Sequence, residues 1–595
     1  MSSMSPGKLN SQKIKASTTP EKFPYSDVDQ TLEAFKLLIQ SCYGPNGYLK
    51  TIQNSCGGQV MITSSSSVLV KQLSVSRPIL KLILSAVGGH VAACSDGGLF
   101  CALLTTNLVK SVRELDLHPV LCIEVNELLL KMCGEFLDAN CVSINVSDVQ
   151  TMLSLVRTVV STKPACGLSV RDTNIIANLT LQAFLNGLPS PTEQSLRIPA
   201  VRYILVEGQT PAESSIVDGV LIECPEIPTY ATKERDNLRR QSISVALYNT
   251  SLSGDEEGIP DIAMETKEGV HLEDASLNQL LVLGRHLVQQ KIGLLACQKV
   301  VHPQLKRFLR SHGVLTIDRL SLLHIDAVQT ITGARVLGTL QACIPEGSFG
   351  HLDGMVHLVL HGKSYFHLQN PSRPVSTFVL CNRTESSLDE LKATCSAANH
   401  VLALTLSHPM AVPGAGCFEA CLAAHLQQQS ASIDSEVFID LGCTRSQFKT
   451  AANNFIHCIE QVARATEHGQ DTQITDSVHH HRWPLPRGVN PSDWLNQCAC
   501  GMKSFDRNSD WQILGAKGDG ATHKLKDPVE TKDFAEQNHL GKEQNKCDIQ
   551  DQGYLEADKE LGLLLDSFVV KQNALHVAVE TANIVLRVHH TIEDR

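Results

Sequence analysis

"SDGGLFCALLTTNLV", residues 95–109, joins two apolar helical segments through a short polar turn. The segment before it, residues 78–94, begins with a proline, which is favoured in the first turn of a helix. After the turn, apolar residues continue on the helical period to about residue 115. Asp96 and the two glycines therefore stand at a helix start, where free backbone N–H groups can hold phosphate oxygens and a carboxylate can hold Mg²⁺.

Two further glycine turns border helices. Gly44-Pro45-Asn46-Gly47 ends a helix that we expect from Ser26, and "VPGAG" (412–416) precedes another apolar run. A single turn of this kind usually only ends a helix. Taken alone, Asp96 is more simply interpreted as the N-cap of the helix that follows it. Three turns of this kind in one chain favour a phosphate site.

The helical pattern is interrupted once. About the first 145 residues are predominantly helical, and the pattern stays helical to about residue 211. Between about 213 and 370, strand-like segments such as "ISVALYN" alternate with helical ones, and helices return afterwards. This order predicts a mainly helical α+β chain with an inserted α/β domain, so that the outer helical parts, including the closing helix "VVKQNALHVAVETANIVLRV", pack together.

The composition argues against several classes of protein. The 595 residues should form about three or four domain-sized units. The net charge of −11 is dispersed, which argues against a nucleic-acid groove. The polar first residues lack an apolar leader and no run of 18 apolar residues occurs, so we expect a soluble, cytoplasmic protein without a membrane span.

The cysteines indicate a reducing compartment. Twenty cysteines lie mostly singly inside apolar runs, as expected for buried thiols. "QCACG", with Cys498 and Cys500, and His479–His481 suggest a metal site, but a CxC pair without a second pair is not a zinc framework. We therefore expect no structural metal, a packed thiol pair and a solvated histidine loop.

Two segments are too polar to form a core. We expect residues 1–25 to be a disordered tail, and the stretch from about Met502 to Tyr554 to be a mobile surface insertion.

Several stretches together resemble the group II chaperonins, the family of the eukaryotic cytosolic ring chaperonin, in order and approximate spacing. They are "YGPNG", "TSSSSVLV", "SDGGLFCALLTTNLV", "LHPV", "STK", "GVLI", "QKVVHPQLKRFLRSHGVLTIDR", "TGARVLG", "VPGAGCFEACLA" and the closing "VVKQNALHVAVETANIVLRV". The resemblance covers nearly the whole chain except the tail and the polar stretch. Within the family, the chain is most similar to the divergent Bardet-Biedl group.

The resemblance implies three domains and a nucleotide site. It implies an equatorial domain (26–145 and 406–595), an intermediate domain (146–212 and 371–405) and an apical substrate-binding domain (213–370). It implies ATP or ADP binding with Mg²⁺ on Asp96. The matching nucleotide-binding positions are Gly44, Pro45, Asn46, Gly47, Asp96, Gly97, Gly98, Lys163, Gly414, Ala415 and Gly416.

The chain departs from the family where hydrolysis is performed. Ser65 stands in place of an aspartate, and Gly98, Leu99 and Phe100 stand in place of threonines. The water-activating aspartate of the family aligns with Glu390, whose extra methylene moves the carboxylate by an amount that can cost ~10²-fold in rate. We therefore expect weak nucleotide binding and little or no ATP hydrolysis.

The family branch implies a role in assembly. We expect a chaperonin-like protein that holds client subunits of the ciliary Bardet-Biedl complex, with other divergent chaperonin-like proteins and the cytosolic chaperonin as partners, located at the centrosome or basal body. The alternatives are an ATP-hydrolysing subunit of a folding ring and a scaffold with a vestigial site. The acidic segment 252–281, where the family carries its lid, suggests a shortened lid and favours a holder.

Overall fold

The computed structural model divides the chain into two compact units, Met1–Ala177 with Asp389–Arg595, and Asn178–Leu388. It describes residues 16–18, 25–53, 60–188, 201–224, 242–254, 271–339, 344–345, 347–373, 375–468, 471–486, 489, 491, 495–506, 509–515, 562–588 and 592–594. The first unit is built from both ends of the chain, as the interrupted helical pattern predicts.

The first unit is a bundle of helices. From the N-terminal part come α1 (Tyr25–Gln40), α2 (Ser66–Gln72), α3 (Pro78–Cys94), α4 (Gly98–Glu114), α5 (Pro119–Asn140) and α6 (Val149–Ser161). From the C-terminal part come α13 (Cys417–Ala431), α14 (Ser435–Asp440), α15 (Arg445–Arg464) and α18 (Phe568–Arg587). Helices α7 (Val170–Asn186) and α12 (Glu385–Ser407) cross the boundaries of the unit.

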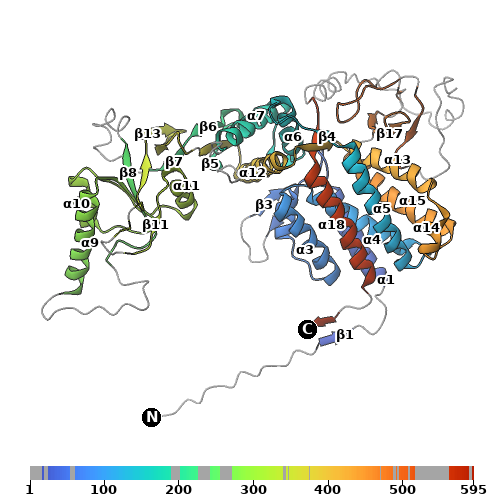
Figure 1. The fold of residues 1–595 in the computed structure, drawn as a ribbon, viewed down its shortest axis with the longest axis horizontal. Coiled ribbons are helices and arrows are strands. Elements are labelled where there is room, and N and C mark those ends of the chain that lie inside the picture. Colours follow the sequence, from blue (N-terminus) through green and yellow to red (C-terminus); the bar gives the residue numbers. More distant parts are fainter. Residues whose placement is uncertain are drawn as a thin grey trace, which may run out of the picture. The chain divides into compact units, whose positions relative to one another are not determined.

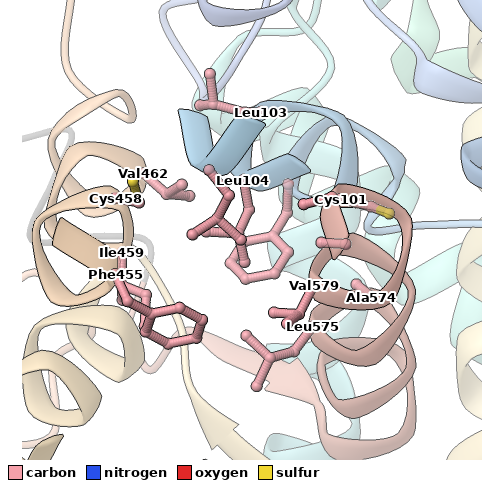
Figure 2. Packing of buried hydrophobic residues seen from close by; sticks show 14 of the residues in the cluster. Cys101, Leu103, Leu104, Phe455, Cys458, Ile459, Val462, Ala574, Leu575 and Val579 are labelled. Atoms are coloured by element: carbon pink, nitrogen blue, oxygen red, sulfur yellow. The ribbon is translucent and has the colours of Figure 1, made fainter. Parts of the chain in front are cut away.

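The closing helix α18 lies in the middle of this bundle. It packs against α3, α4 and α5, so that the red C-terminal helix stands beside the blue N-terminal ones (Figure 1). Leu104 of α4, Phe455 of α15 and Leu575 of α18 meet in one buried cluster (Figure 2). Truncating such an aromatic or aliphatic side chain typically costs about 2–5 kcal/mol, which makes the junction of the two chain ends a main source of stability.

A three-stranded sheet joins distant segments next to this core. Strand β16 (Met410–Pro413) pairs antiparallel with β4 (Val142–Ser143) and with β20 (Leu565–Ser567). This pairing fixes where the 414–416 turn begins and where α18 starts. Nearby, β2 (Lys50–Gln53) and β3 (Val60–Thr63) form a hairpin-like antiparallel pair.

A second small sheet corrects one prediction. Strand β17 (Thr472–Asp476) pairs with β18 (Arg482–Leu485) and with β19 (Trp511–Ile513). Phe505 and Leu514 are buried, although both lie in the stretch from Met502 that we expected to bury no core. Apolar residues that stand singly in a polar sequence can still be buried here, because they pack against the elements around the small sheet. Residues 516–561 lie outside the described residues.

The N-terminal tail also contains a strand. We expected no structure through residue 25, but β1 (Ala16–Thr18) pairs antiparallel with β21 (Ile592–Asp594). This strand forms by pairing with the other end of the chain, and local composition alone does not predict such a pairing.

Between about residues 213 and 370 the second unit has the alternating α/β pattern that the sequence predicts, but the expectation of helix up to about residue 211 is wrong, because residues 201–207 form a strand that pairs with a distant segment, 376–382. Strands β10 (Leu315–Ile317), β9 (Ile292–Cys297), β8 (Ile243–Tyr248) and β11 (Val336–Leu337) form a parallel array, to which β12 (Gly350–Leu352) adds antiparallel. Its helices are α9 (Leu272–Gln289), α10 (Pro303–Ser311) and α11 (Leu322–Thr332). Residues 255–270 of the segment that we associated with a lid lie outside the described residues.

Two antiparallel or mixed sheets complete the second unit. One has the order β13 (Gly354–Leu360), β14 (Lys363–Gln369), β7 (Val220–Glu223), and the other β5 (Val201–Glu207), β15 (Ser376–Asn382), β6 (Ser215–Asp218). Strand β15 is buried along its whole length between its two neighbours. Among the helices that the structure describes, none combines the length and apolarity needed to cross a bilayer.

Candidate functional site

Residues from all of the predicted phosphate-side turns line one cavity in the first unit. From the predicted set the cavity is lined by Gly44, Pro45, Asp96, Gly97, Lys163, Ala415 and Gly416. Further lining residues that matter chemically are Ser66, Leu99, Phe100, Glu419, Arg482, Asp566, Ser567 and Lys571. The turns are about 370 residues apart at most, and the packing of α18 and the β16 sheet brings them together.

Two helices begin at this cavity. Helix α4 has Gly97 as its N-cap (φ 76°), and α13 has Gly416 (φ 78°); neither has a side-chain cap. The first N–H groups of both helices are therefore not satisfied by a capping side chain, and such groups attract anions. Asp96 precedes the cap, so the simpler interpretation of Asp96 as the N-cap of α4 is wrong.

Gly98 has a different role from Gly97. A Cβ on Gly98 would lie 2.5 Å from Val91 Cγ2 and 2.7 Å from Ser66 Oγ, so this glycine allows α4 to approach α3 and α2. Some predicted binding residues are not among the described residues that line the cavity: Asn46, Gly47, Gly98 and Gly414. Sequence position alone does not separate a glycine that faces a ligand from one that faces a neighbouring helix.

Asp96 and Lys163 form an ion pair across the cavity wall. Lys163 Nζ lies 3.5 Å from Asp96 Oδ1 and donates to Thr162 Oγ1 at 3.1 Å. The Lys163 side chain is 9% exposed and that of Asp96 29%, so only the carboxylate is partly open to solvent. These two predicted residues, from the α3–α4 turn and the end of α6, are therefore brought together.

The centre of the cavity wall is a charge cluster that the sequence analysis missed. Lys571 Nζ contacts Glu419 Oε1 at 2.7 Å and Asp566 Oδ2 at 2.8 Å, and lies 4.6 Å from the centroid of the Phe100 ring. Burial opposes the charge on Lys571, but the two carboxylates outweigh it and raise the Lys571 pKa well above its ordinary value. Burial also raises the pKa of Asp566 more than Lys571 lowers it.

The charge cluster had a signal in the sequence. Glu419 interrupts the apolar helical run "CFEACLA", and Lys571 directly follows the apolar residues "FVV" at the start of α18. A charged residue on a buried helical face needs a partner, and the two charges have opposite sign.

Two polar atoms of the cavity residues lack partners. Glu419 Oε2 and Ser567 Oγ are buried and have no hydrogen-bond partner in the part of the chain that the structure describes. Leaving such atoms unpaired costs about 1–3 kcal/mol each. Neither atom is accessible from the cavity, so a hydroxyl or amino group of a ligand could satisfy them only after a local rearrangement.

Glu390 is held by hydrogen bonds and is not among the described residues that line the cavity. Its carboxylate accepts from Thr63 Oγ1 at 2.7 Å, from Ser64 N at 3.0 Å and from Ser64 Oγ at 3.1 Å, and the residue is 3% exposed. This arrangement does not support the catalytic role that the resemblance implies for Glu390. Ser65, at the position of the family's aspartate, bonds Ser67 instead, with 2.9 Å between the hydroxyl oxygens.

The comparisons with known proteins agree with this architecture. A model of the TCP-1/cpn60 chaperonin family matches residues 36–465. Molecular chaperone MKKS of Homo sapiens is 33% identical over 576 residues, and that of Mus musculus 34% over 579, with 96% of each chain covered in both cases. Thermosome subunit alpha of Sulfolobus acidocaldarius is 22% identical over 410 residues, which cover 67% of this chain and 72% of that protein.

The identity with the MKKS chaperones is higher than the identity with the archaeal thermosome subunit. The stretches "SCYGPNGYLK", "STKPACGLS" and "CQKVVHP" likewise resemble the McKusick-Kaufman syndrome protein. The chain therefore belongs to the TCP-1/cpn60 chaperonin family, as a divergent chaperonin-like member related to the MKKS chaperones.

Proposed function

We propose that this chaperonin-like chain holds client subunits during assembly of the ciliary Bardet-Biedl complex, and that its cavity binds ATP or ADP weakly without efficient hydrolysis. The observation that carries the nucleotide part is the cavity itself, which is lined by two helix starts without a side-chain cap and by the Asp96–Lys163 pair. The assembly role rests on the resemblance to the Bardet-Biedl group and on kinship with proteins described as molecular chaperones.

We expect nucleotide binding to be weak because the cationic side chains of the cavity already have partners in the protein. Three cations, Lys163, Arg482 and Lys571, lie among the lining residues, but the structure gives each of them protein partners. Lys571 is held by two carboxylates, and Arg482 Nε donates to Ala415 O at 2.8 Å. Polyphosphate would have to compete with these contacts, so much of the Coulomb gain is offset.

The same residues argue against efficient hydrolysis. A bound Mg²⁺, with Asp96 as its carboxylate ligand, would supply charge compensation for the phosphates. Activation of water needs a second carboxylate within hydrogen-bond reach, and the carboxylate of Glu390 is occupied by Thr63 and Ser64. Leu99 and Phe100 line the cavity without hydroxyl donors, so hydrogen bonds that would form to the transferring phosphoryl group are missing.

We further propose that the partners are other divergent chaperonin-like proteins and the cytosolic chaperonin, and that the protein acts at the centrosome or basal body. The second unit, with its parallel array and flanking helices, is the proposed surface for clients. Reconstitution of the Bardet-Biedl complex from its subunits, with and without this chain, tests the assembly role; equal yields in both would contradict it.

Nucleotide titration with parallel phosphate release tests the site. We expect wild-type protein to bind ATP in Mg²⁺, and Asp96→Ala to bind about tenfold more weakly, a loss of ~1.4 kcal/mol. In EDTA the variant should bind no worse than wild type, because Asp96 then contributes only negative charge. Phosphate release should stay at background for both proteins.

A matched control is Asp138→Ala, an exposed aspartate of α5 that does not line the cavity. It should leave the titration unchanged. The persistence of the Asp96–Lys163 pair favours the alternative, an ATP-hydrolysing ring subunit. Steady phosphate release by wild type that Asp96→Ala abolishes would establish that alternative and refute the proposal.

A further inference from the structure

Four buried side chains that can bind a metal converge beside the cavity, in the first unit. They are Cys417, His481, Cys498 and Cys500, and their ligand atoms all lie within 4.8 Å of one another. Cys417 is the first residue of α13, directly after Gly416, and His481 directly precedes β18. Each of the four is at most 5% exposed.

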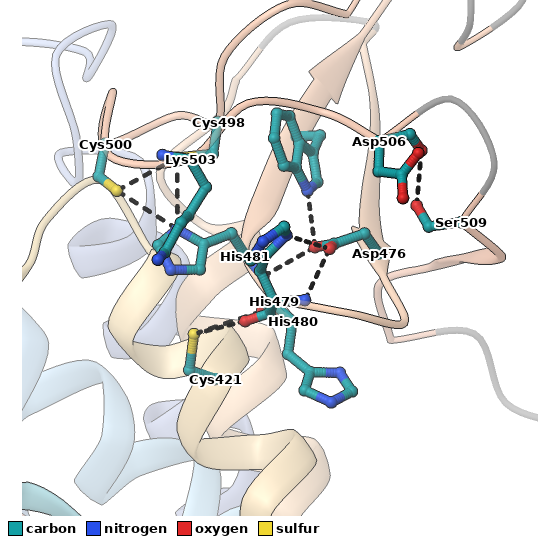
Figure 3. Close-up of polar contacts among 11 residues, drawn as sticks. Cys421, Asp476, His479, His480, His481, Cys498, Cys500, Lys503, Asp506 and Ser509 are labelled. Atoms are coloured by element: carbon teal, nitrogen blue, oxygen red, sulfur yellow. Dashed lines mark hydrogen bonds and ion pairs between the residues drawn. The ribbon is translucent and has the colours of Figure 1, made fainter. Parts of the chain in front are cut away.

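The contacts within this cluster are short and not covalent. His481 Nδ1 lies 3.3 Å from Cys498 Sγ and 3.4 Å from Cys500 Sγ, and the two sulfurs are 3.4 Å apart (Figure 3). All three cysteines are free. The expected solvated histidine loop is therefore wrong for His481, which is buried with its ring nitrogen directed at two thiols.

Packing alone does not explain this arrangement. The three cysteines pack against apolar side chains such as Trp483 and Phe505, as other buried thiols of this chain pack in the helical core, but they also lie beside one another and beside an imidazole. Here three sulfurs and an imidazole nitrogen share one small volume and compete for few hydrogens. A cation that accepts all four lone pairs would resolve that competition.

We propose that Cys417, His481, Cys498 and Cys500 form a structural zinc site. Three thiolates and one imidazole are a known tetrahedral donor set for Zn²⁺, with Zn–S bonds near 2.3 Å and neighbouring sulfurs about 3.8 Å apart. Soft thiolate donors disfavour Mg²⁺ and Ca²⁺, which take oxygen ligands. The four protein ligands leave no open coordination position, so the site is structural and not catalytic.

The residues around the ligands hold them in place, as an outer shell does in zinc sites. Asp476, whose side chain is fully buried, accepts from His481 N at 3.1 Å and from Trp483 Nε1 at 2.9 Å, which fixes the loop that carries His481 (Figure 3). Lys503 N donates to Cys498 Sγ at 3.2 Å, a bond that favours the thiolate form.

The site would fasten one wall of the cavity. Cys417 follows the Ala415–Gly416 turn, and Arg482 after His481 bonds Ala415 O. Cys500 O accepts from Leu564 N, in the segment that leads to Asp566. Metal binding would thus add to the apolar packing that holds the small β17–β18–β19 sheet, whether or not the cavity holds nucleotide.

Metal analysis of the full chain tests this inference. The protein is purified without a polyhistidine tag, in reductant, and dialysed against a weak chelator before elemental analysis. We expect about one zinc per chain, released in step with titration of thiols by an organomercurial. Cobalt-substituted protein should show the visible absorption of a tetrahedral Co²⁺–thiolate centre.

Variants assign the ligands. Cys498→Ser and Cys500→Ser should each lose most of the bound zinc. Cys421→Ser is the matched control and should keep it, because Cys421 lies one turn further along α13, outside the group of four ligand atoms, and its thiol donates to the carbonyls of His479 and His480. If the ligand variants do not fold, the zinc content and thiol titration of wild type still decide the question.

Several results would overturn the zinc site. Folded wild-type protein without stoichiometric metal, a Cys498–Cys500 disulfide found by mass spectrometry under reductant, or iron in place of zinc would each do so. Zinc that Cys421→Ser loses as readily as Cys498→Ser would also count against these four ligands.

Discussion

Replacing Glu390 with glutamine tests whether its carboxylate has a structural or a catalytic role. Glutamine keeps the length and shape of the side chain and one acceptor oxygen for Ser64. Its amide NH₂ cannot accept from Thr63 Oγ1, which now donates at 2.7 Å and already accepts from Ser65 N at 3.0 Å. The Thr63 hydroxyl would therefore lose its acceptor inside a buried site.

The magnitude follows from the one hydrogen bond that is lost. A bond to a charged group contributes about 1.5–3 kcal/mol, so Glu390→Gln, which loses the bond from Thr63 and keeps an acceptor for Ser64, should lower the free energy of unfolding by about 2–3 kcal/mol. For roughly 300 described residues in the first unit, an unfolding entropy of ~2.1 cal/mol/K per residue converts this to a fall in Tm of about 3–5 °C.

Thermal unfolding and phosphate release, measured on the same preparations, decide between the roles. Asp389→Asn is the matched control, since Asp389 is the exposed neighbour on α12 and its loss should leave Tm within about 1 °C. Glu390→Gln should lower Tm and leave phosphate release at background. An unchanged Tm together with a fall in measurable wild-type turnover would refute the structural assignment.

Two further predictions concern buried charge. Lys571→Met should destabilise the protein by about 3–5 kcal/mol in urea unfolding, because Glu419 and Asp566 lose their common cation, and adding Asp566→Asn should recover part of the loss. His400 accepts or donates a 2.6 Å bond with Ser95, and burial lowers its pKa below 6.5, so the folded state resists its protonation. Stability should therefore fall as pH drops from about 6.5 to 5, and the fall should be smaller in His400→Gln when urea midpoints are compared across that range.

Most of the fold could be predicted because its signals are local. Proline at the start of α3 and helical periodicity through α4 and α18 specify elements whose bounds the structure confirms to within a few residues. The docking of α18 on the N-terminal helices followed from its one apolar face. Strand β15 was missed because a strand buried on both sides has no alternation and merges with the neighbouring apolar sequence.

The sequence predicted only those residues of the candidate site that lie in a recognisable glycine turn. Gly97 and Gly416 could be found because each stands in a glycine turn at a helix start, whereas the role of Lys571 depends on Glu419, a partner far away in the sequence. Cys417 shows the same limit, since it lies about 80 residues before Cys498 and no spacing motif connects them. Contacts of this kind depend on tertiary packing, which one sequence does not display.

Two residues that the resemblance places at catalytic positions of the family make structural contacts in this fold. Phe100 stands where the family has a threonine, and its ring lies under the Lys571 ammonium. Glu390 stands where the family has a water-activating aspartate, and its extra methylene is consistent with the reach to Thr63 and Ser64. Both side chains thus make contacts that stabilise the resting protein. If the nucleotide site proposed above lacks turnover, as we expect, these contacts explain how the chaperonin framework can keep residues that do not serve hydrolysis, which suits the proposed holder of client subunits better than a cycling ring subunit.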